Sequence, residues 1–155
     1  MADNENYKSW LSKAMAACSR REYCRSEIEN MAESWGADED DRKKIIQTLT
    51  EENFINEERY ASAFVRDKFT YNKWGKQKIS MHLKAKRIPP ELIRNALDSI
   101  DNDKYLKMIS DLITSHRKHV KAKNNYDLKS KLLRYGLSKG FESHLLYEIL
   151  GDLEE

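Results

Sequence analysis

Apolar residues recur along the chain at helical spacing, between stretches that are mostly polar. Ile28, Met31, Ala32 and Trp35 stand at i, i+3, i+4 and i+7, which places all four side chains on one face of a helix. The chain contains only five glycines and two prolines among its 155 residues, so few positions interrupt a helix. The pattern predicts an all-α protein with nine helices of about 10 to 18 residues each.

One apolar spacing occurs twice in full, 53 residues apart. Ile79 is followed by apolar residues at +9, +13, +14, +17 and +18, and Leu132 is followed by apolar residues at the same offsets. Ile28 begins a weaker copy, in which Asp41 and Arg42 occupy +13 and +14. A period of about 50 residues is typical of repeat proteins, whose units stack to share one continuous core. We therefore predict three tandem three-helix repeats in an elongated, curved array.

Polar and helix-breaking residues mark where helices begin. Asp38 is suited to an N-cap, because its carboxylate accepts hydrogen bonds from free backbone N–H groups. Gly75 precedes a helix, and Pro89-Pro90 starts another, since proline suits the first helical turn. A third repeat starts near Asp101. These signals predict repeats at residues 1–53, 54–100 and 101–155.

Charge is strongly segregated although the net charge is only +2. Residues 27–58 carry eleven acidic side chains against three basic ones, whereas residues 66–87 and 115–139 each carry eight basic side chains against one acidic one. Such blocks create local potential. We interpret the basic blocks as a surface for DNA phosphates or for an acidic protein, the alternative being ordinary solvated helix faces. The residues assigned to this surface are Arg66, Lys73, Trp74, Lys76, Lys78, Lys84, Lys86, Arg87, Lys121, Lys123, Lys129 and Arg134.

Trp74 and Arg59 each have two competing interpretations, and the lysines beside Trp74 suggest anion binding. Lys73, Lys76 and Lys78 lie near the start of a helix, where free backbone N–H groups favour anions. Trp74 is suited to stack on a base, but a tryptophan at such a place more often packs between helices. For Arg59 we expect an ion pair or a carbonyl contact between helices, and a direct partner contact is the alternative.

Several functional classes find no support in the sequence. No run of 18 apolar residues indicates a membrane span, and the polar residues 1–6 do not resemble a secretory signal. Cys18 and Cys24 lack zinc or redox spacing and are expected to be reduced thiols in the cytoplasm. His116 and His119 have no third ligand at metal-binding spacing. Because phosphate loops and nucleophile motifs are also missing, we expect no enzyme, metal or cofactor.

Several segments resemble the motifs of a known protein family. Residues 21–28 look like the N-terminal motif of the RecX family, and residues 53–61, ending in Arg59-Tyr60-Ala61, resemble its most diagnostic segment. Asn56 replaces the first acidic residue of that segment and is still able to cap a helix. Residues 73–97 and 133–141 resemble the middle and third repeats, so the match spans residues 10–150.

The resemblance implies a bacterial regulator of the RecA recombinase. Such a protein lies in the groove of the RecA–DNA filament and limits its extension, ATPase activity and strand exchange. The implied partners are the RecA nucleoprotein filament and the DNA backbone, and we expect a monomer in the cytoplasm that acts in DNA repair, recombination and the SOS response.

An autonomous DNA-binding protein with helix-turn-helix-like units is the alternative function. That function requires a compact recognition helix rich in Arg, Asn and Gln at base-reading positions. The basic segments of this chain are instead rich in lysine, which suits contacts to the DNA backbone. We therefore rank this alternative second.

Overall fold

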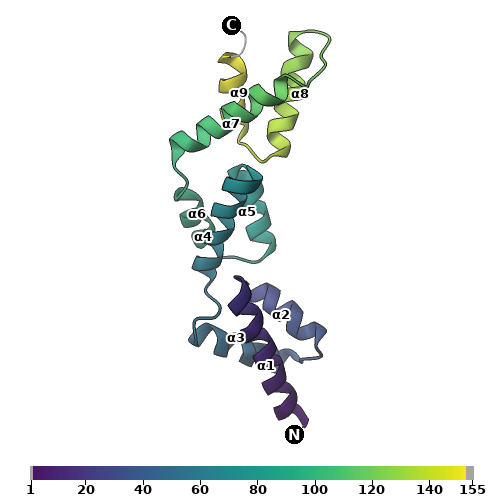
Figure 1. Ribbon diagram of the computed structural model, residues 1–155, viewed down its shortest axis with the longest axis vertical. Helices are drawn as coiled ribbons and strands as arrows, with labels where there is room; N and C mark the ends of the chain where they lie inside the picture. Colours follow the sequence, from purple (N-terminus) through teal and green to yellow (C-terminus); the bar gives the residue numbers. More distant parts are fainter. Residues whose placement is uncertain (1, 153–155) are drawn as a thin grey trace. The chain divides into compact units, whose positions relative to one another are not determined.

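The computed structural model describes residues 2–152, and every regular element within them is helical (Figure 1). This confirms the all-α prediction. The elements are α1 (Ala2–Arg20), α2 (Arg25–Ser34), α3 (Glu39–Glu51), α4 (Glu57–Asp67), the π-helical turn η1 (Lys68–Asn72), α5 (Lys76–Ala85), α6 (Pro90–Asp98), α7 (Asn102–Arg117), α8 (Asn125–Ser138) and α9 (Ser143–Asp152).

The chain forms two compact units, which are described separately. Unit 1 comprises residues 1–63 and 83–93, and unit 2 comprises residues 64–82 and 94–155. Helices α1 to α3 therefore belong to unit 1 and helices α7 to α9 to unit 2, whereas α4, α5 and α6 each contribute to both. The predicted repeat boundaries at residues 1–53, 54–100 and 101–155 stay a prediction.

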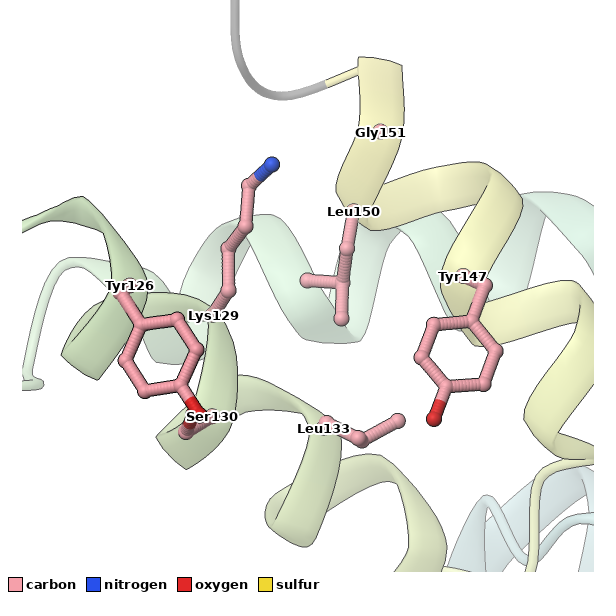
Figure 2. Close-up of a pocket in the computed structure, with 7 residues that line it drawn as sticks. All are labelled: Tyr126, Lys129, Ser130, Leu133, Tyr147, Leu150 and Gly151. Atoms are coloured by element: carbon pink, nitrogen blue, oxygen red, sulfur yellow. The ribbon is translucent and has the colours of Figure 1, made fainter.

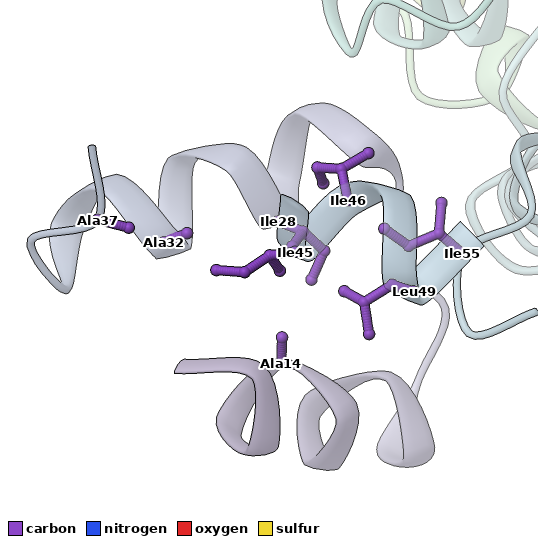
Figure 3. Packing of buried hydrophobic residues seen from close by; sticks show 8 residues of the cluster. All are labelled: Ala14, Ile28, Ala32, Ala37, Ile45, Ile46, Leu49 and Ile55. Carbon is purple, nitrogen blue, oxygen red and sulfur yellow. The ribbon is translucent and has the colours of Figure 1, made fainter. Parts of the chain in front are cut away.

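The core of unit 1 is built from short and branched apolar side chains of α1, α2 and α3. Figure 3 shows Ala14 of α1 facing Ile45 and Leu49 of α3, with Ile28 of α2 beside them. All four of these side chains are fully buried. An alanine at this point lets α1 approach the branched side chains closely, as the dense packing of protein interiors requires.

The repeated spacing corresponds to burial in the structure. In every copy the first residue and the residue at +9 are buried, and in both full copies the residue at +14 is buried as well. The buried residues at the first position and at +9 are Ile28 and Ala37, Ile79 and Ile88, and Leu132 and Phe141. The recurring apolar positions are therefore explained by packing, which leaves the charged residues between them to be considered for function.

A left-handed turn recurs at position +8 of every copy. Gly36 has φ of 100°, Arg87 has φ of 62° and Gly140 has φ of 91°. This conformation places the next residue in the core at the start of the third helix. Glycine adopts it at no steric cost, whereas a side chain such as that of Arg87 adopts it with strain.

The expected helix starts and the structural role of Arg59 are confirmed. The Asp38 carboxylate accepts a hydrogen bond from the Asp41 backbone N–H at 2.8 Å, so it caps α3. Arg59 Nε donates to Glu22 Oε2 at 2.7 Å, and Arg59 Nη2 donates to the carbonyl oxygens of Asn53 and Phe54 at 3.1 and 3.2 Å. The guanidinium therefore makes both an ion pair and carbonyl contacts inside unit 1.

In unit 2, helices α7, α8 and α9 contact one another and enclose a second set of buried residues. Tyr105 and Phe141 meet edge to face with ring centroids 6.3 Å apart. His116 occupies a place on α7 where the pattern favours an apolar residue, and its ring stacks on Tyr135 at 3.7 Å. Stacking explains why an imidazole replaces an apolar side chain there.

Candidate functional site

The π-helical turn η1 concentrates lysines around Trp74. The Trp74 backbone N–H donates to the Lys68 carbonyl at 3.0 Å, and Lys73 between them adopts a left-handed φ of 55°. The Lys68 ammonium lies 4.9 Å from the centre of the Trp74 ring, and the Lys78 ammonium lies 4.6 Å from it. Two cations therefore lie against one indole ring, where its quadrupole attracts them.

Trp74 also packs against other rings of unit 2. Its ring centroid lies 4.5 Å from that of His82 and 6.4 Å from that of Phe64, and its side chain is half-buried. These contacts support the packing interpretation of Trp74. Its contact with a partner stays a prediction.

Lys139 joins the same group of charges from the turn between α8 and α9. Its Nζ donates to the Asn72 carbonyl at 2.9 Å, which holds it beside η1. Burial, followed by repulsion from Lys78 and Lys73, lowers the pKa of the Lys139 ammonium. We refer to Lys68, Lys73, Lys78 and Lys139 as the lysine cluster.

Within the described part of the chain, no ion pair neutralises a member of the lysine cluster. Lys73 Nζ reaches a backbone carbonyl, that of Thr70, at 3.5 Å. A carbonyl dipole compensates a full positive charge much less than a carboxylate does. The cluster is therefore a local excess of positive charge.

The expectation of free N–H groups at the start of α5 is wrong. The Gly75 N–H donates to the Lys139 carbonyl at 2.7 Å, the Lys76 N–H to the Tyr105 hydroxyl at 2.9 Å, and the Gln77 N–H to the Gly140 carbonyl at 3.0 Å. These donors are taken by the turn before α9 and by α7, so they are not available to an anion. The sequence gives no sign of this because the partners lie 29 to 64 positions away.

Close backbone contact makes this arrangement possible. A Cβ atom on Gly75 would lie 2.2 Å from the Gly140 carbonyl oxygen, and one on Gly140 would lie 2.3 Å from Lys78 Cβ. The Tyr105 hydroxyl also donates to Glu142 Oε1. Burial, followed by that hydrogen bond, raises the pKa of Tyr105 well above its usual value. These contacts fix the position of the lysine cluster on the fold.

The remaining residues of the first basic block are distributed over both units. Lys84, Lys86 and Arg87 belong to unit 1, whereas Arg66 and Lys76 belong to unit 2. Lys86 Nζ pairs with Glu27 Oε2 at 3.2 Å, Arg66 Nε pairs with Asp67 Oδ1 at 3.6 Å, and the Lys76 ammonium lies 4.9 Å from the Tyr105 ring centre. Lys84 and Arg87 are exposed.

The second basic block lies in the loop before α8 and along that helix. Lys121, Lys123 and Arg134 are exposed, and Lys129 lines a groove between α8 and α9. The loop is held against α8, because Lys131 Nζ donates to the Lys121 carbonyl at 2.6 Å. These residues form a second basic region of unit 2.

Reasoning from the sequence left two members of the lysine cluster out of the predicted site. Lys68 and Lys139 counted toward the charged blocks but were not assigned to the contact surface. Lys139 lies 61 positions after Lys78, and no pattern in one sequence connects them. Among residues 5–152, whose side chains the structure describes, no group of three or more His, Cys, Asp or Glu is placed to hold a metal. No helix in that range is long and apolar enough to cross a membrane.

The comparisons with known proteins agree on one family. Residues 56–97 match the family model for the second three-helix domain of RecX. A "Regulatory protein RecX" from Clostridium botulinum (strain Eklund 17B / Type B) is 34% identical over 122 residues, which are 76% of this chain and 54% of that protein. The chain belongs to the RecX family.

Other RecX relatives match nearly the whole chain or a large part of it. The "Regulatory protein RecX" of Clostridium beijerinckii is 26% identical over 152 residues, covering 97% of this chain and 70% of that protein. The one from Clostridium perfringens (strain 13 / Type A) is 32% identical over 111 residues, covering 69% and 50%. The chain thus spans about half the length of two of these relatives and 70% of the third.

Solved RecX structures share this fold. The crystal structure of RecX from Lactobacillus salivarius superimposes with a TM-score of 0.82 at 23% identity, covering 99% of both chains. A second regulatory protein RecX superimposes with a TM-score of 0.87 at 20% identity, covering 97% of this chain and 74% of that one. Within the RecX match, residues 56–97 contain three members of the lysine cluster, and Lys139 lies outside it.

Proposed function

We propose that this chain is a regulator that binds in the groove of the RecA–DNA filament and limits its extension, ATPase activity and strand exchange. The relatives named regulatory protein RecX support a regulatory role. On this proposal the chain works in the cytoplasm through binding, without a catalytic site, metal or cofactor of its own.

The observation that carries the proposal is the unneutralised lysine cluster. Burial lowers the pKa of Lys139, and repulsion from the nearby Lys78 and Lys73 lowers it further. A polyanion relieves such repulsion when it binds, and the free energy gained is sequence-independent and salt-dependent. DNA phosphates and the acidic surface of a protein filament both fit this chemistry.

The other basic residues are proposed to make further contacts of the same kind, each within its own unit. Lys121, Lys123, Lys129 and Arg134 supply further positive charge in unit 2, and Lys84 and Arg87 supply it in unit 1. Lys86 is proposed to contribute less, because Glu27 already neutralises it at 3.2 Å. Phosphate contacts of this kind orient a protein on DNA without reading its sequence.

The direct test is the DNA-dependent ATPase activity of purified RecA with increasing amounts of this protein. Regulation of the filament predicts inhibition by amounts well below one molecule per RecA subunit. Unchanged ATPase activity at a molar excess of folded protein would contradict the proposal. A gel-shift assay without RecA separates the alternative, since tight sequence-specific binding to DNA alone would favour an autonomous DNA-binding protein.

A further inference from the structure

In both units the start of a middle helix contacts a left-handed turn, although the contacting groups differ. We call residues 35–37, 86–88 and 139–141 the receiving turns, because each carries the left-handed residue before the third helix of a repeat. In unit 1 the Lys86 carbonyl accepts a hydrogen bond from Ser26 Oγ, at the start of α2, at 2.7 Å. In unit 2 the Gly140 carbonyl accepts one from the Gln77 N–H, at the start of α5, at 3.0 Å. A middle helix therefore docks on a receiving turn twice.

In the remaining receiving turn, residues 35–37, Gly36 is open within the described chain, whereas Ala37 is buried and its carbonyl accepts a hydrogen bond from Arg42 Nη1 at 2.8 Å. A Cβ atom built on Gly36 would meet nothing within 4 Å, whereas one on Gly140 would meet Lys78 at 2.3 Å. The first turn of α3 follows directly and carries Glu39, Asp40 and Asp41. Lys43 pairs with Glu39 at 3.4 Å, and Arg42 and Lys13 lie against Ala37 and Trp35, so the acidic part of this rim is centred on Asp40.

The remaining middle helix, α8, has an open apolar groove beside it. Figure 2 shows Tyr126 and Tyr147 on opposite sides of this groove, with Leu133 and Leu150 between them. The groove encloses about 400 Å³. Tyr126 is 82% exposed and Tyr147 is 62% exposed, which is unusual for such large side chains. The loop before α8 gives this end of unit 2 a basic rim.

We propose that the α8–α9 groove of one molecule binds the Gly36 turn of a second copy of this chain. Two arguments select a second copy as the occupant. The contact continues the one that α2 and α5 already make, since α8 is the middle helix of its own repeat. In addition, the basic loop around Lys121 and Lys123 and the acidic turn of α3 have opposite charge.

The details of this contact differ from those of the α5 contact. Leu128, inside α8, stands at the position that Gly75 occupies just before α5, four positions before the first core residue of each copy. A leucine there keeps the backbone of α8 from approaching a turn as closely as Gly75 approaches Gly140. The exposed tyrosines then supply the contact area, as aromatic side chains commonly do at interfaces.

The two surfaces are different, so the association is head to tail and does not close at a dimer. Molecules are monomeric when dilute and form dimers and longer chains as concentration rises, in place of the strict monomer expected from the sequence. Salt weakens the association because opposite charges meet at its rim. Neither RecA nor DNA takes part, so failure of this proposal leaves the proposed function untouched.

Sedimentation velocity of the purified protein alone tests this association. At low salt the wild-type sedimentation coefficient is expected to rise continuously with concentration. The groove variant Tyr126→Glu/Tyr147→Glu and the turn variant Asp40→Lys are each expected to remain monomeric. Tyr71→Glu, at a tyrosine that is 79% exposed on η1, and Glu52→Lys, at an exposed site at the opposite end of α3 from the turn, are matched controls that behave as wild type.

Mixing the two deficient variants gives the sharpest result. Each keeps one intact surface, so an equimolar mixture is expected to form a one-to-one dimer that grows no further. A monomeric wild type over the whole concentration range would overturn the proposal, and so would a mixture that stays monomeric. Circular dichroism checks folding, and the milder groove variant Tyr147→Ser replaces the double variant if the latter unfolds.

Discussion

The starts of α5 and α2 perform the same task with different chemistry. In unit 2, backbone N–H groups of residues 75–77 reach the turn at Gly140 and the hydroxyl of Tyr105. In unit 1, side chains make the contact: Ser26 Oγ donates to the Lys86 carbonyl at 2.7 Å, and Glu27 pairs with Lys86 Nζ at 3.2 Å. The backbone contact requires that no side chain separate Gly75 from the turn at Gly140. The contact through Glu27 instead depends on the charge of its carboxylate, and therefore on pH.

The substitution with the largest expected effect disrupts the backbone contact at Gly75. Gly75→Ala places a Cβ atom 2.2 Å from the Gly140 carbonyl oxygen, so the backbone of α5 has to move away. We expect the free energy of unfolding to fall by about 3 kcal/mol, at the upper end for overpacking, because backbone atoms do not yield as side chains do. Urea denaturation of both proteins measures this difference in the free energy of unfolding.

Gly151→Ala is the matched control for this change. A Cβ atom on Gly151 meets nothing within 4 Å, and the residue lies in α9. Alanine in an open helical position stabilises by roughly 0.5–1 kcal/mol relative to glycine. Equal losses of stability in the two variants would show that the close approach of Gly75 is not what matters.

The side-chain contact in unit 1 is expected to depend on pH. Burial alone raises the pKa of Glu27, but the hydrogen bond from the Cys24 N–H and the charge of Lys86 outweigh it and lower the pKa below its usual value. The stabilisation is therefore complete above the unfolded pKa of about 4.3 and is lost as pH falls through the folded pKa. Glu27→Gln is expected to cost about 1 kcal/mol at neutral pH.

The pH dependence distinguishes the two kinds of contact. The difference in stability between wild type and Glu27→Gln is expected to stay constant near neutral pH and to shrink below about pH 4. Thermal unfolding from pH 3 to pH 7 measures it, with the exposed Glu33→Gln as control. A difference that is the same at pH 3 and pH 7 would contradict the charge pairing.

The smallest expected effect concerns the receiving turns. Arg87 holds a φ of 62° where the equivalent residues are Gly36 and Gly140. Arg87→Gly removes this strain, and we expect a gain of about 0.5 kcal/mol after the greater freedom of glycine in the unfolded chain is subtracted. Lys84→Gly, within α5, is expected to lose about 1 kcal/mol instead. A loss in both variants would show that Arg87 is not strained.

Helices and core positions were predictable because local patterns determine them. The spacing after Ile79 and Leu132 identified buried faces, and Asp38 identified the start of α3. Contacts between distant segments were not predictable. Nothing in the sequence indicates that the N–H of Gly75 is bound by the Lys139 carbonyl, so the start of α5 was taken as open.

In the candidate site, too, residues close in the sequence were predictable and a residue from a distant segment was not. The sequence marked Lys73 and Lys78 as basic surface residues, and the structure keeps them together near Trp74. It missed Lys139, which reaches them from the turn before α9 through a hydrogen bond to the Asn72 carbonyl. Assembling a charged cluster across 61 positions requires the tertiary fold, which charge counting along the chain does not supply.

Charge reversal of the lysine cluster tests the central claim most directly. Lys73→Glu/Lys78→Glu/Lys139→Glu is compared with Lys8→Glu/Lys44→Glu/Lys104→Glu, which changes the same charge at exposed positions elsewhere. The measurement is inhibition of the RecA ATPase over a range of salt concentrations, with folding checked by circular dichroism. We predict that the cluster variant needs at least about tenfold more protein and that its log–log salt slope is smaller by about 3. Equal inhibition and equal salt slopes for the two folded variants would contradict the account.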